Sequence, residues 1–165
     1  MESSNLVVCE LKGIENSNPE ILFSFPPLNL NDKDHNDLIP KFLPFGSKIS
    51  NFYVSRYSKY NILSYIFKIK NDNNRDNLVS LSALIKKREN AEIFKPILKL
   101  IVNTLDENHL LTEDNLEKNL ALIYKGINDE QDIVIENISI SISKKFEQIK
   151  SKLIKDKPKL KGSFL

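Results

Sequence analysis

The sequence predicts an α+β fold: one five-stranded antiparallel sheet with helices on both faces, followed by a basic C-terminal helix. Two patterns lead to this prediction. Along five segments, apolar residues alternate with the period of two that is typical of strands burying one face. After residue 90, apolar residues recur at spacings of three and four, which indicates amphipathic helices that pack on the sheet.

The first two strands are expected near residues 5–12 and 20–25. Residues 15–19 between them read Glu-Asn-Ser-Asn-Pro, a composition that favours a turn, so the two strands should form a hairpin. Pro26 and Pro27 end the second strand, because proline cannot donate to the hydrogen-bond ladder of a sheet.

A short helix is expected next. Asn31 or Asp32 can cap its N-terminus, and Pro40 and Pro44 limit its length. Its apolar residues, three and four apart, are Leu38, Ile39, Phe42 and Leu43.

Three further strands follow near residues 50–57, 60–70 and 77–86 and should form a meander, with residues 71–76 as an exposed hairpin tip. Two of these strands have one fully apolar face, formed by Leu63, Tyr65, Phe67 and Ile69 in the first case and by Val79, Leu81, Ala83 and Ile85 in the second. Their opposite faces mix apolar residues with serines. We therefore expect helices to cover one face of the sheet heavily and the other lightly.

Two helices are expected after the sheet. The first should begin near Lys95, so that Pro96 lies in its first turn, and should continue to Leu105. Thr112 can cap the second, which covers residues 113–125 and ends at Gly126.

Residues 133–142 fit either a strand or a helix, because their isoleucines suit both periods. From Ser143 onward a helix is favoured, since only a helix accounts for the apolar spacing beyond this point. We therefore divide the chain into a domain of residues 1–130 and a basic helical extension and tail of residues 131–165.

The extension is rich in lysine, and two interpretations stay open. In the first, it is an amphipathic helix on an anionic membrane or in a partner's groove, with Phe146, Ile149 and Leu153 opposite the lysines. In the second, the helix packs on the domain and its lysines face solvent. The lysines concerned are Lys144, Lys145, Lys150, Lys152 and Lys155.

The sequence carries none of the common patterns of catalysis or cofactor binding. Its 4 glycines lie far apart, at positions 13, 46, 126 and 162, so it has neither a phosphate-binding loop nor a dinucleotide fingerprint. His35 and His109 lie in polar segments without a nearby nucleophile. We therefore expect a protein that is not an enzyme and that has no cofactor or metal.

Charge and cysteine content further limit the class of protein and the compartment in which it is expected. A net charge of +2 and the scarcity of arginine argue against a nucleic-acid binder. Cys9, the single cysteine, lies within the first strand, which indicates a buried thiol in a reducing compartment. No apolar run reaches the length of a membrane span.

A group of aromatic residues follows the short helix and offers candidate contacts to a protein partner. Tyrosine combines apolar area with a polar tip, which suits interfaces. Either most of these rings fill the core beneath the short helix, or one or two of them stay at the surface as anchors. We expect a partner surface near the second and third strands, with Tyr53 or Tyr57 as an anchor. The candidate partner-binding residues are Phe42, Phe45, Tyr53, Tyr57 and Tyr60.

The order of strand, strand, short helix, three-strand meander and two helices resembles the longin domain, a profilin-like fold. Residues 20–27, 43–46 and 75–81 resemble archaeal longins and the N-terminal longin-like module of DENN-family proteins in their local sequence. The resemblance covers about residues 5–125. The hairpin tip without glycine at 71–74 departs from the family pattern.

This resemblance implies a non-catalytic adaptor of membrane-traffic machinery. Longin domains bind a small GTPase or pair with another longin or a roadblock-type protein, and some such pairs act as nucleotide-exchange factors. We therefore expect a cytoplasmic homo- or heterodimer, peripheral to a membrane at most. The alternative is a membrane-surface or structural protein that acts through its basic amphipathic C-terminal helix.

Overall fold

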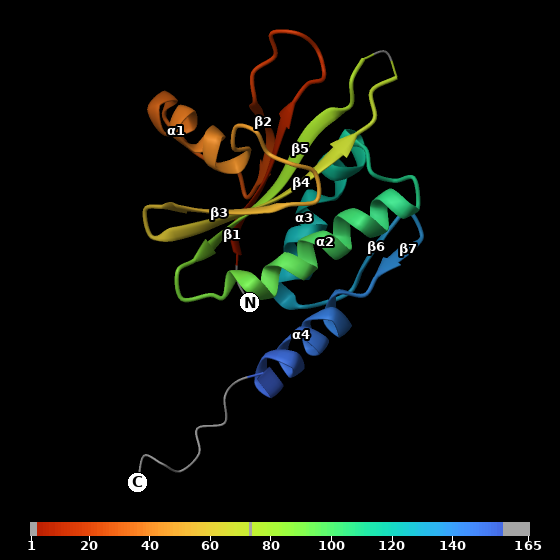
Figure 1. Ribbon diagram of the computed structural model, residues 1–165. Helices are drawn as coiled ribbons and strands as arrows, with labels where there is room; N and C mark the ends of the chain where they lie inside the picture. The colour runs from red at the N-terminus through yellow and green to blue at the C-terminus, as the bar shows by residue number, and fades with distance from the viewer. Residues whose placement is uncertain (1–2, 73, 157–165) are drawn as a thin grey trace.

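The computed structural model describes residues 3–72 and 74–156, which form a five-stranded antiparallel sheet with helices on both faces (Figure 1). The strands lie in the order β2-β1-β5-β4-β3. The elements in chain order are β1 (Ser3–Leu11), β2 (Glu20–Phe25), α1 (Asp32–Phe42), β3 (Phe52–Tyr57), β4 (Tyr60–Ile69), β5 (Asn77–Lys86), α2 (Ala91–Glu107), α3 (Glu113–Asp129), β6 (Ile133–Ile135), β7 (Ile138–Ile140) and α4 (Ile142–Asp156). The predicted α+β class and the antiparallel sheet of five strands are confirmed.

The two faces of the sheet carry separate cores. One face packs against α2 and α3, and its core includes Leu6 and Val8 of β1. The other face packs against α1 alone and includes Val7 and Cys9 of the same strand. Because strand β1 alternates between the two cores, both of its faces are buried. The predicted imbalance, with heavy helix cover on one face and light cover on the other, is confirmed.

Serines on the α1 face lie beneath the end of α1. Ser64 of β4 and Ser82 of β5 are paired in the sheet register and share a hydrogen bond of 2.6 Å between their hydroxyl oxygens. The hydroxyl of Ser64 also lies 3.5 Å from the carbonyl oxygen of Lys41, and that of Ser82 lies 3.4 Å from the carbonyl oxygen of Phe42. Because each hydroxyl has a single proton, one serine donates to the other, and the serine that accepts can donate to its carbonyl. These carbonyls lie in the last turn of α1, where helix carbonyls have no partner within the helix.

Helix α1 begins as the sequence predicts. The side chain of Asn31, its N-cap, accepts a hydrogen bond of 2.8 Å from the backbone N–H of Asp34. Asp32 and Asp34 lie in the first turn, where carboxylates interact favourably with the helix dipole.

Two predicted helix boundaries are wrong. Helix α2 begins at Ala91 with Asn90 as its N-cap, so Pro96 lies inside the helix instead of in its first turn. Proline has no N–H, so Pro96 leaves the carbonyl of Glu92 without its partner within the helix. Glu92 lies at the exposed start of the helix, where water can bind this carbonyl.

Helix α3 continues past Gly126 to Asp129 and ends at Glu130, which adopts a left-handed conformation with φ of 53°. Gly126 has a packing role instead. A Cβ atom built there would lie 2.5 Å from the Cγ2 atom of Ile133, so the glycine lets β6 approach the helix.

The segment that fitted either a strand or a helix forms the short β6–β7 hairpin, and the helix expected from Ser143 begins one residue earlier as α4. Phe146 of α4 is buried in the same core as α2 and α3, and Ile149 and Leu153 pack against it. Lys150 donates a hydrogen bond of 2.5 Å to Glu130, at the end of α3. The helix is therefore packed on the domain.

Replacing Phe146 with alanine should lower the free energy of unfolding by about 3–5 kcal/mol, because the substitution leaves a cavity between α4 and α2. Urea unfolding followed by circular dichroism measures the loss. Ile154 is an exposed residue of the same helix, and Ile154→Ala should change stability by no more than about 0.5 kcal/mol. Equal effects of the two substitutions would contradict the packing of α4.

The Cys9 thiol should be unreactive in the folded protein. Burial raises the pKa of this thiol to about 12, so the reactive thiolate is scarce as well as inaccessible. A disulfide-exchange reagent at mildly alkaline pH should label the thiol only at the rate at which the protein unfolds. Rapid and complete labelling in native buffer would show that β1 opens easily.

Candidate interaction site

Strand β3 forms a free edge of the sheet. It pairs with β4 on one side, and among residues 3–72 and 74–156 no strand pairs with its other side. Its sequence, Phe-Tyr-Val-Ser-Arg-Tyr, consists mostly of residues with high strand propensity and contains no proline. Val54 is half exposed.

The aromatic side chains of β3 point to different faces. Phe52 lies on the α2 face, where its ring is 4.8 Å from that of Tyr65. Tyr53 and Tyr57 lie on the α1 face and pack partly against the small core there. The hydroxyl of Tyr53 accepts a hydrogen bond of 3.0 Å from the backbone N–H of Lys48, which fixes the loop before the strand.

The predicted aromatic group is therefore divided. Phe42, the last residue of α1, is completely buried between the helix and the sheet, so it is a core residue and its side chain is not accessible to a partner in this structure. Phe45, only three positions later, is fully exposed. Tyr60 lies at the β3–β4 turn, half-buried, with the ammonium of Lys59 5.8 Å from its ring.

The expected single surface near the second and third strands does not exist. β2 and β3 occupy opposite edges of the sheet, with three strands between them. Strand order cannot be read from alternation, because every strand of a sheet shows the same period. Tyr53 and Tyr57 are half-buried on the α1 face, so truncating them would also disturb the core.

The lysines of α4 have different surroundings. Lys144, Lys152 and Lys155 are exposed on its outer side. Lys150 pairs with Glu130; partial burial opposes ionisation of this carboxyl, but the hydrogen bond from Lys150 helps to hold its pKa below the ordinary value. Lys145 lines a depression beside α2.

The apolar side of α4 is occupied by the domain, as described above. The outer side of α4, which carries exposed lysines together with Glu147, Gln148 and Ile154, faces solvent. Binding a membrane through the apolar stripe would therefore require α4 to detach. No helix within residues 3–72 and 74–156 combines the length and apolar character that a membrane crossing demands.

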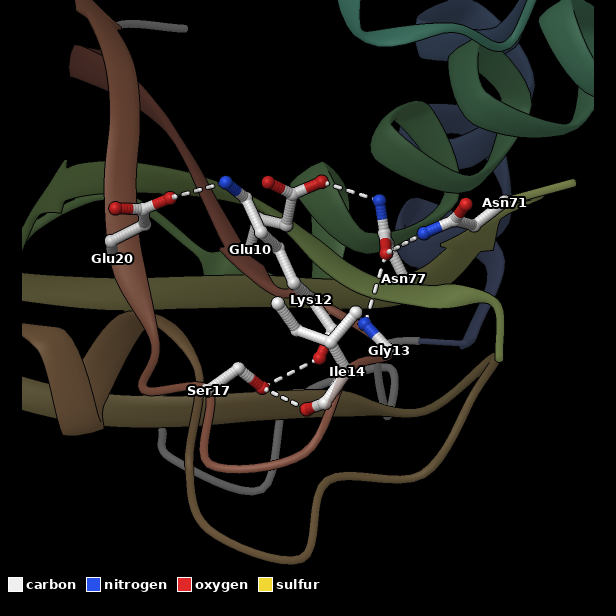
Figure 2. A network of polar contacts seen from close by, with 8 residues as sticks. All are labelled: Glu10, Lys12, Gly13, Ile14, Ser17, Glu20, Asn71 and Asn77. Atoms are coloured by element: carbon white, nitrogen blue, oxygen red, sulfur yellow. Dashed lines mark hydrogen bonds and ion pairs between the residues drawn. The ribbon is translucent and has the colours of Figure 1, made fainter. Parts of the chain in front are cut away.

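A second candidate site is a polar network at the end of the sheet, where the β1–β2 loop meets the β4–β5 hairpin (Figure 2). Asn77 of β5 lies at its centre. Its Nδ2 donates to Oε1 of Glu10 at 2.9 Å, and its Oδ1 accepts from the backbone N–H of Gly13 at 3.0 Å. Asn71 donates to the same Oδ1 at 3.3 Å. One amide side chain therefore joins β1, the loop that follows it and the hairpin.

Gly13 is required at this junction for a steric reason. A Cβ atom built on it would lie 1.8 Å from the carbonyl oxygen of Arg75, in the hairpin. No side chain fits at that separation, so the two loops are in direct backbone contact.

Glu10 is unusual because it is a carboxylate in the core, 1% exposed. Its Oε2 atom has no hydrogen-bond partner among the described residues. Burial raises the pKa of the Glu10 carboxyl, and the negative charge of Glu113 at the start of α3 raises it further. Lys12 and Asn77 act in the opposite direction.

The alternation of apolar residues in β1 carries a signal for the burial of Glu10. Glu10 shares its face of β1 with Leu6 and Val8, so the alternation already placed it toward the core. A buried carboxylate reduces stability, and such residues often have a role other than folding.

Comparison with known proteins adds no assignment. The chain matches no model of a protein family, and a search of curated proteins finds no match.

The substitution Glu10→Gln should stabilise the protein at neutral pH. A carboxyl whose pKa is raised by folding costs nothing below its ordinary pKa of about 4, where it is protonated in both states, and the cost is complete above the raised pKa. Melting temperatures measured from pH 4 to pH 8 should therefore diverge as the pH rises, by a few degrees, since 1 kcal/mol corresponds to about 2–4 °C.

The matched control is Glu117→Gln, at an exposed position of α3, which should show no such divergence. A Glu10→Gln variant that is less stable than the wild type at neutral pH would show that the ionised carboxylate stabilises the fold.

Proposed function

We propose that this protein is a non-catalytic, longin-like adaptor that binds a protein partner through edge strand β3. The partner would be a small GTPase or another longin or roadblock-type protein of membrane-traffic machinery. The observation that carries the proposal is the free β3 edge, which has a half-exposed Val54 and a single charged side chain, Arg56.

An open edge of this kind is normally protected. Natural sheets protect their edges with proline, inward-pointing charge or a covering element, because unpaired N–H and C=O groups attract other strands. β2, the opposite edge, is followed directly by Pro26 and Pro27 and contacts α3. β3 contains no proline and none follows it directly, and it contacts α1 on one face of the sheet. The outer N–H and C=O groups of β3 have no strand partner in the described part of the chain, which supports strand addition by a partner, a mode in which main-chain hydrogen bonds supply much of the affinity.

The architecture also supports the longin-like part of the proposal. The resemblance implies five antiparallel strands with one helix on one face and two on the other. The arrangement of α1 against α2 and α3 agrees with that expectation. The proposal assigns no catalytic role to any residue of the chain.

Val54→Lys should abolish partner binding without unfolding the protein. A lysine on an edge strand opposes strand addition and at a half-exposed position costs little stability. The measurement is affinity purification of the tagged protein from its native lysate, followed by mass spectrometry. We expect wild-type protein to retain a small GTPase or a longin-type protein, and Val54→Lys to lose it.

The control for this experiment is Val134→Lys, a change of the same kind at an exposed position of β6, far from β3 in the fold (Figure 1). This variant should retain the partner. Retention of the partner by Val54→Lys, or its loss from both variants, would contradict binding at the β3 edge.

The isolated protein should not bind nucleotides. An adaptor contributes to nucleotide turnover only through its GTPase, so calorimetry with GTP or ATP and magnesium should show no affinity tighter than about 1 mM, or about 4 kcal/mol. Saturable micromolar binding to the chain alone would overturn the adaptor proposal.

A further inference from the structure

We propose that the trough between α1 and the β1–β2 loop binds an extended segment of a partner protein, one that carries a large apolar side chain followed a few residues later by a carboxylate. The trough lies at the hairpin end of the sheet, on the α1 face, and does not include β3. The inference therefore does not depend on the function proposed for the β3 edge.

The first compartment of the trough is apolar. It has a volume of about 630 Å³ and is formed by the end of α1, the turn that follows, the β1–β2 loop and the adjoining ends of two strands. Leu11 and Leu78 come from the sheet, Ile39 comes from α1, and Leu43 is the C-cap residue directly after α1. None of the lining residues is charged, so this compartment suits an uncharged, apolar side chain. They are Leu11, Ser17, Asn18, Pro19, Asn36, Ile39, Pro40, Leu43, Pro44, Phe45, Gly46, Ser47 and Leu78.

Phe45 lies at the rim of this compartment and is fully exposed. The next residue, Gly46, adopts φ of 75°, a conformation that glycine allows at no steric cost. A partner segment that enters the compartment would also cover the ring of Phe45. Binding of the segment would therefore remove both the Phe45 ring and the apolar lining from water, and both changes are favourable.

The second compartment adjoins the first and has polar and charged residues in its lining. It has a volume of about 540 Å³, and Leu11, Ser17 and Leu78 line both compartments. It extends from the β1–β2 loop, whose contacts Figure 2 shows, to the hairpin residues Arg75 and Asp76.

Charges in the second compartment determine which partner it fits. Lys12 pairs with Glu20 at 3.8 Å, and Asp76 pairs with Lys68 at 3.6 Å. Arg75 forms no ion pair with any residue in the described part of the chain and is exposed.

The backbone of Arg75 is in contact with Gly13, which fixes the position from which the Arg75 side chain extends. The N–H donors of its guanidinium remain available to a ligand. A guanidinium binds carboxylates through two parallel hydrogen bonds, which makes an acidic residue the complementary group. Glu15 lines the same compartment and would repel an acidic residue of the partner, so neutralising Glu15 should strengthen binding.

The shape of the trough favours a polypeptide segment over a small molecule. Both compartments are open to solvent along one side, whereas a small ligand is usually 70–90% buried in its pocket. An extended chain needs cover on only one side. Side-chain amides and hydroxyls in the lining, from Asn18, Asn36 and Ser17, can bond to its backbone.

The test uses two pentapeptides that are acetylated at the N-terminus and amidated at the C-terminus. The acidic peptide is Leu-Leu-Gly-Glu-Glu, and the neutral peptide is Leu-Leu-Gly-Gln-Gln. Each is titrated into isotope-labelled protein, and binding is followed by amide chemical shifts. We expect saturable shifts around Leu11, Phe45 and Leu78, and a Kd for the acidic peptide about threefold lower, as for a partly exposed ion pair.

Variants locate the two contacts. Arg75→Gln should abolish the preference for the acidic peptide, while Glu15→Gln should increase it. Phe45→Ala should weaken both peptides roughly tenfold, as expected when a large apolar contact is lost. Arg88→Gln is the matched control, because Arg88 is another exposed arginine, located beyond the opposite end of β5, and it should leave both Kd values unchanged. Phe45, Arg75 and Glu15 are exposed, so melting temperatures should confirm that these variants fold.

Four results would overturn the inference. The first is the absence of saturable shifts with either peptide. The second is equal affinity for both peptides in the wild type, or equal effects of Arg75→Gln and Arg88→Gln. The third is self-association of the wild type that Phe45→Ala abolishes, which would assign the trough to a second copy of the chain. Shifts confined to β3 would instead support the edge as the binding site and overturn the trough.

Discussion

The pairing of β1 with β5 is the interaction on which the rest of the structure depends. It joins the N-terminal hairpin to the meander of β3, β4 and β5, and without it the chain would have two separate small sheets. In this register Val8 lies opposite Leu81 on the face that α2 and α3 cover, and Val7 lies opposite Ser82 on the α1 face. A shift of one residue would exchange the two cores, so the helices on both faces hold the register in place.

This pairing also joins distant parts of the chain. The chain must close a loop that contains β2, α1, β3 and β4 before β1 and β5 can meet, and such long-range contacts slow folding. The meander and its helices involve shorter separations. A β1 strand that arrives late completes both cores at once, since its alternate side chains belong to both.

The sequence predicted the elements well and their contacts poorly, and particular residues show why. Alternation identified all five strands, because burying one face imposes that period whatever the neighbouring strand is. Gly126 was predicted to end a helix, but its missing side chain makes room for Ile133, a contact that only tertiary structure creates. Phe42 and Phe45 are only three residues apart, yet one lies in the core and the other in solvent, because α1 ends between them. The β3 edge depends on strand order, and the burial of Glu10, whose Oε2 finds no partner in the described part of the chain, depends on packing; local patterns encode neither.

The contact between Gly13 and the carbonyl of Arg75 constrains how this protein can change over evolutionary time. The β1–β2 loop and the β4–β5 hairpin are far apart in the sequence, but at this point they form one structural unit that Asn77 bonds together. An insertion or a bulkier residue in one loop displaces the backbone of the other. Viable variants should therefore change the two loops together: where the hairpin shortens or turns away, a side chain at position 13 becomes tolerable, and elsewhere the glycine is retained.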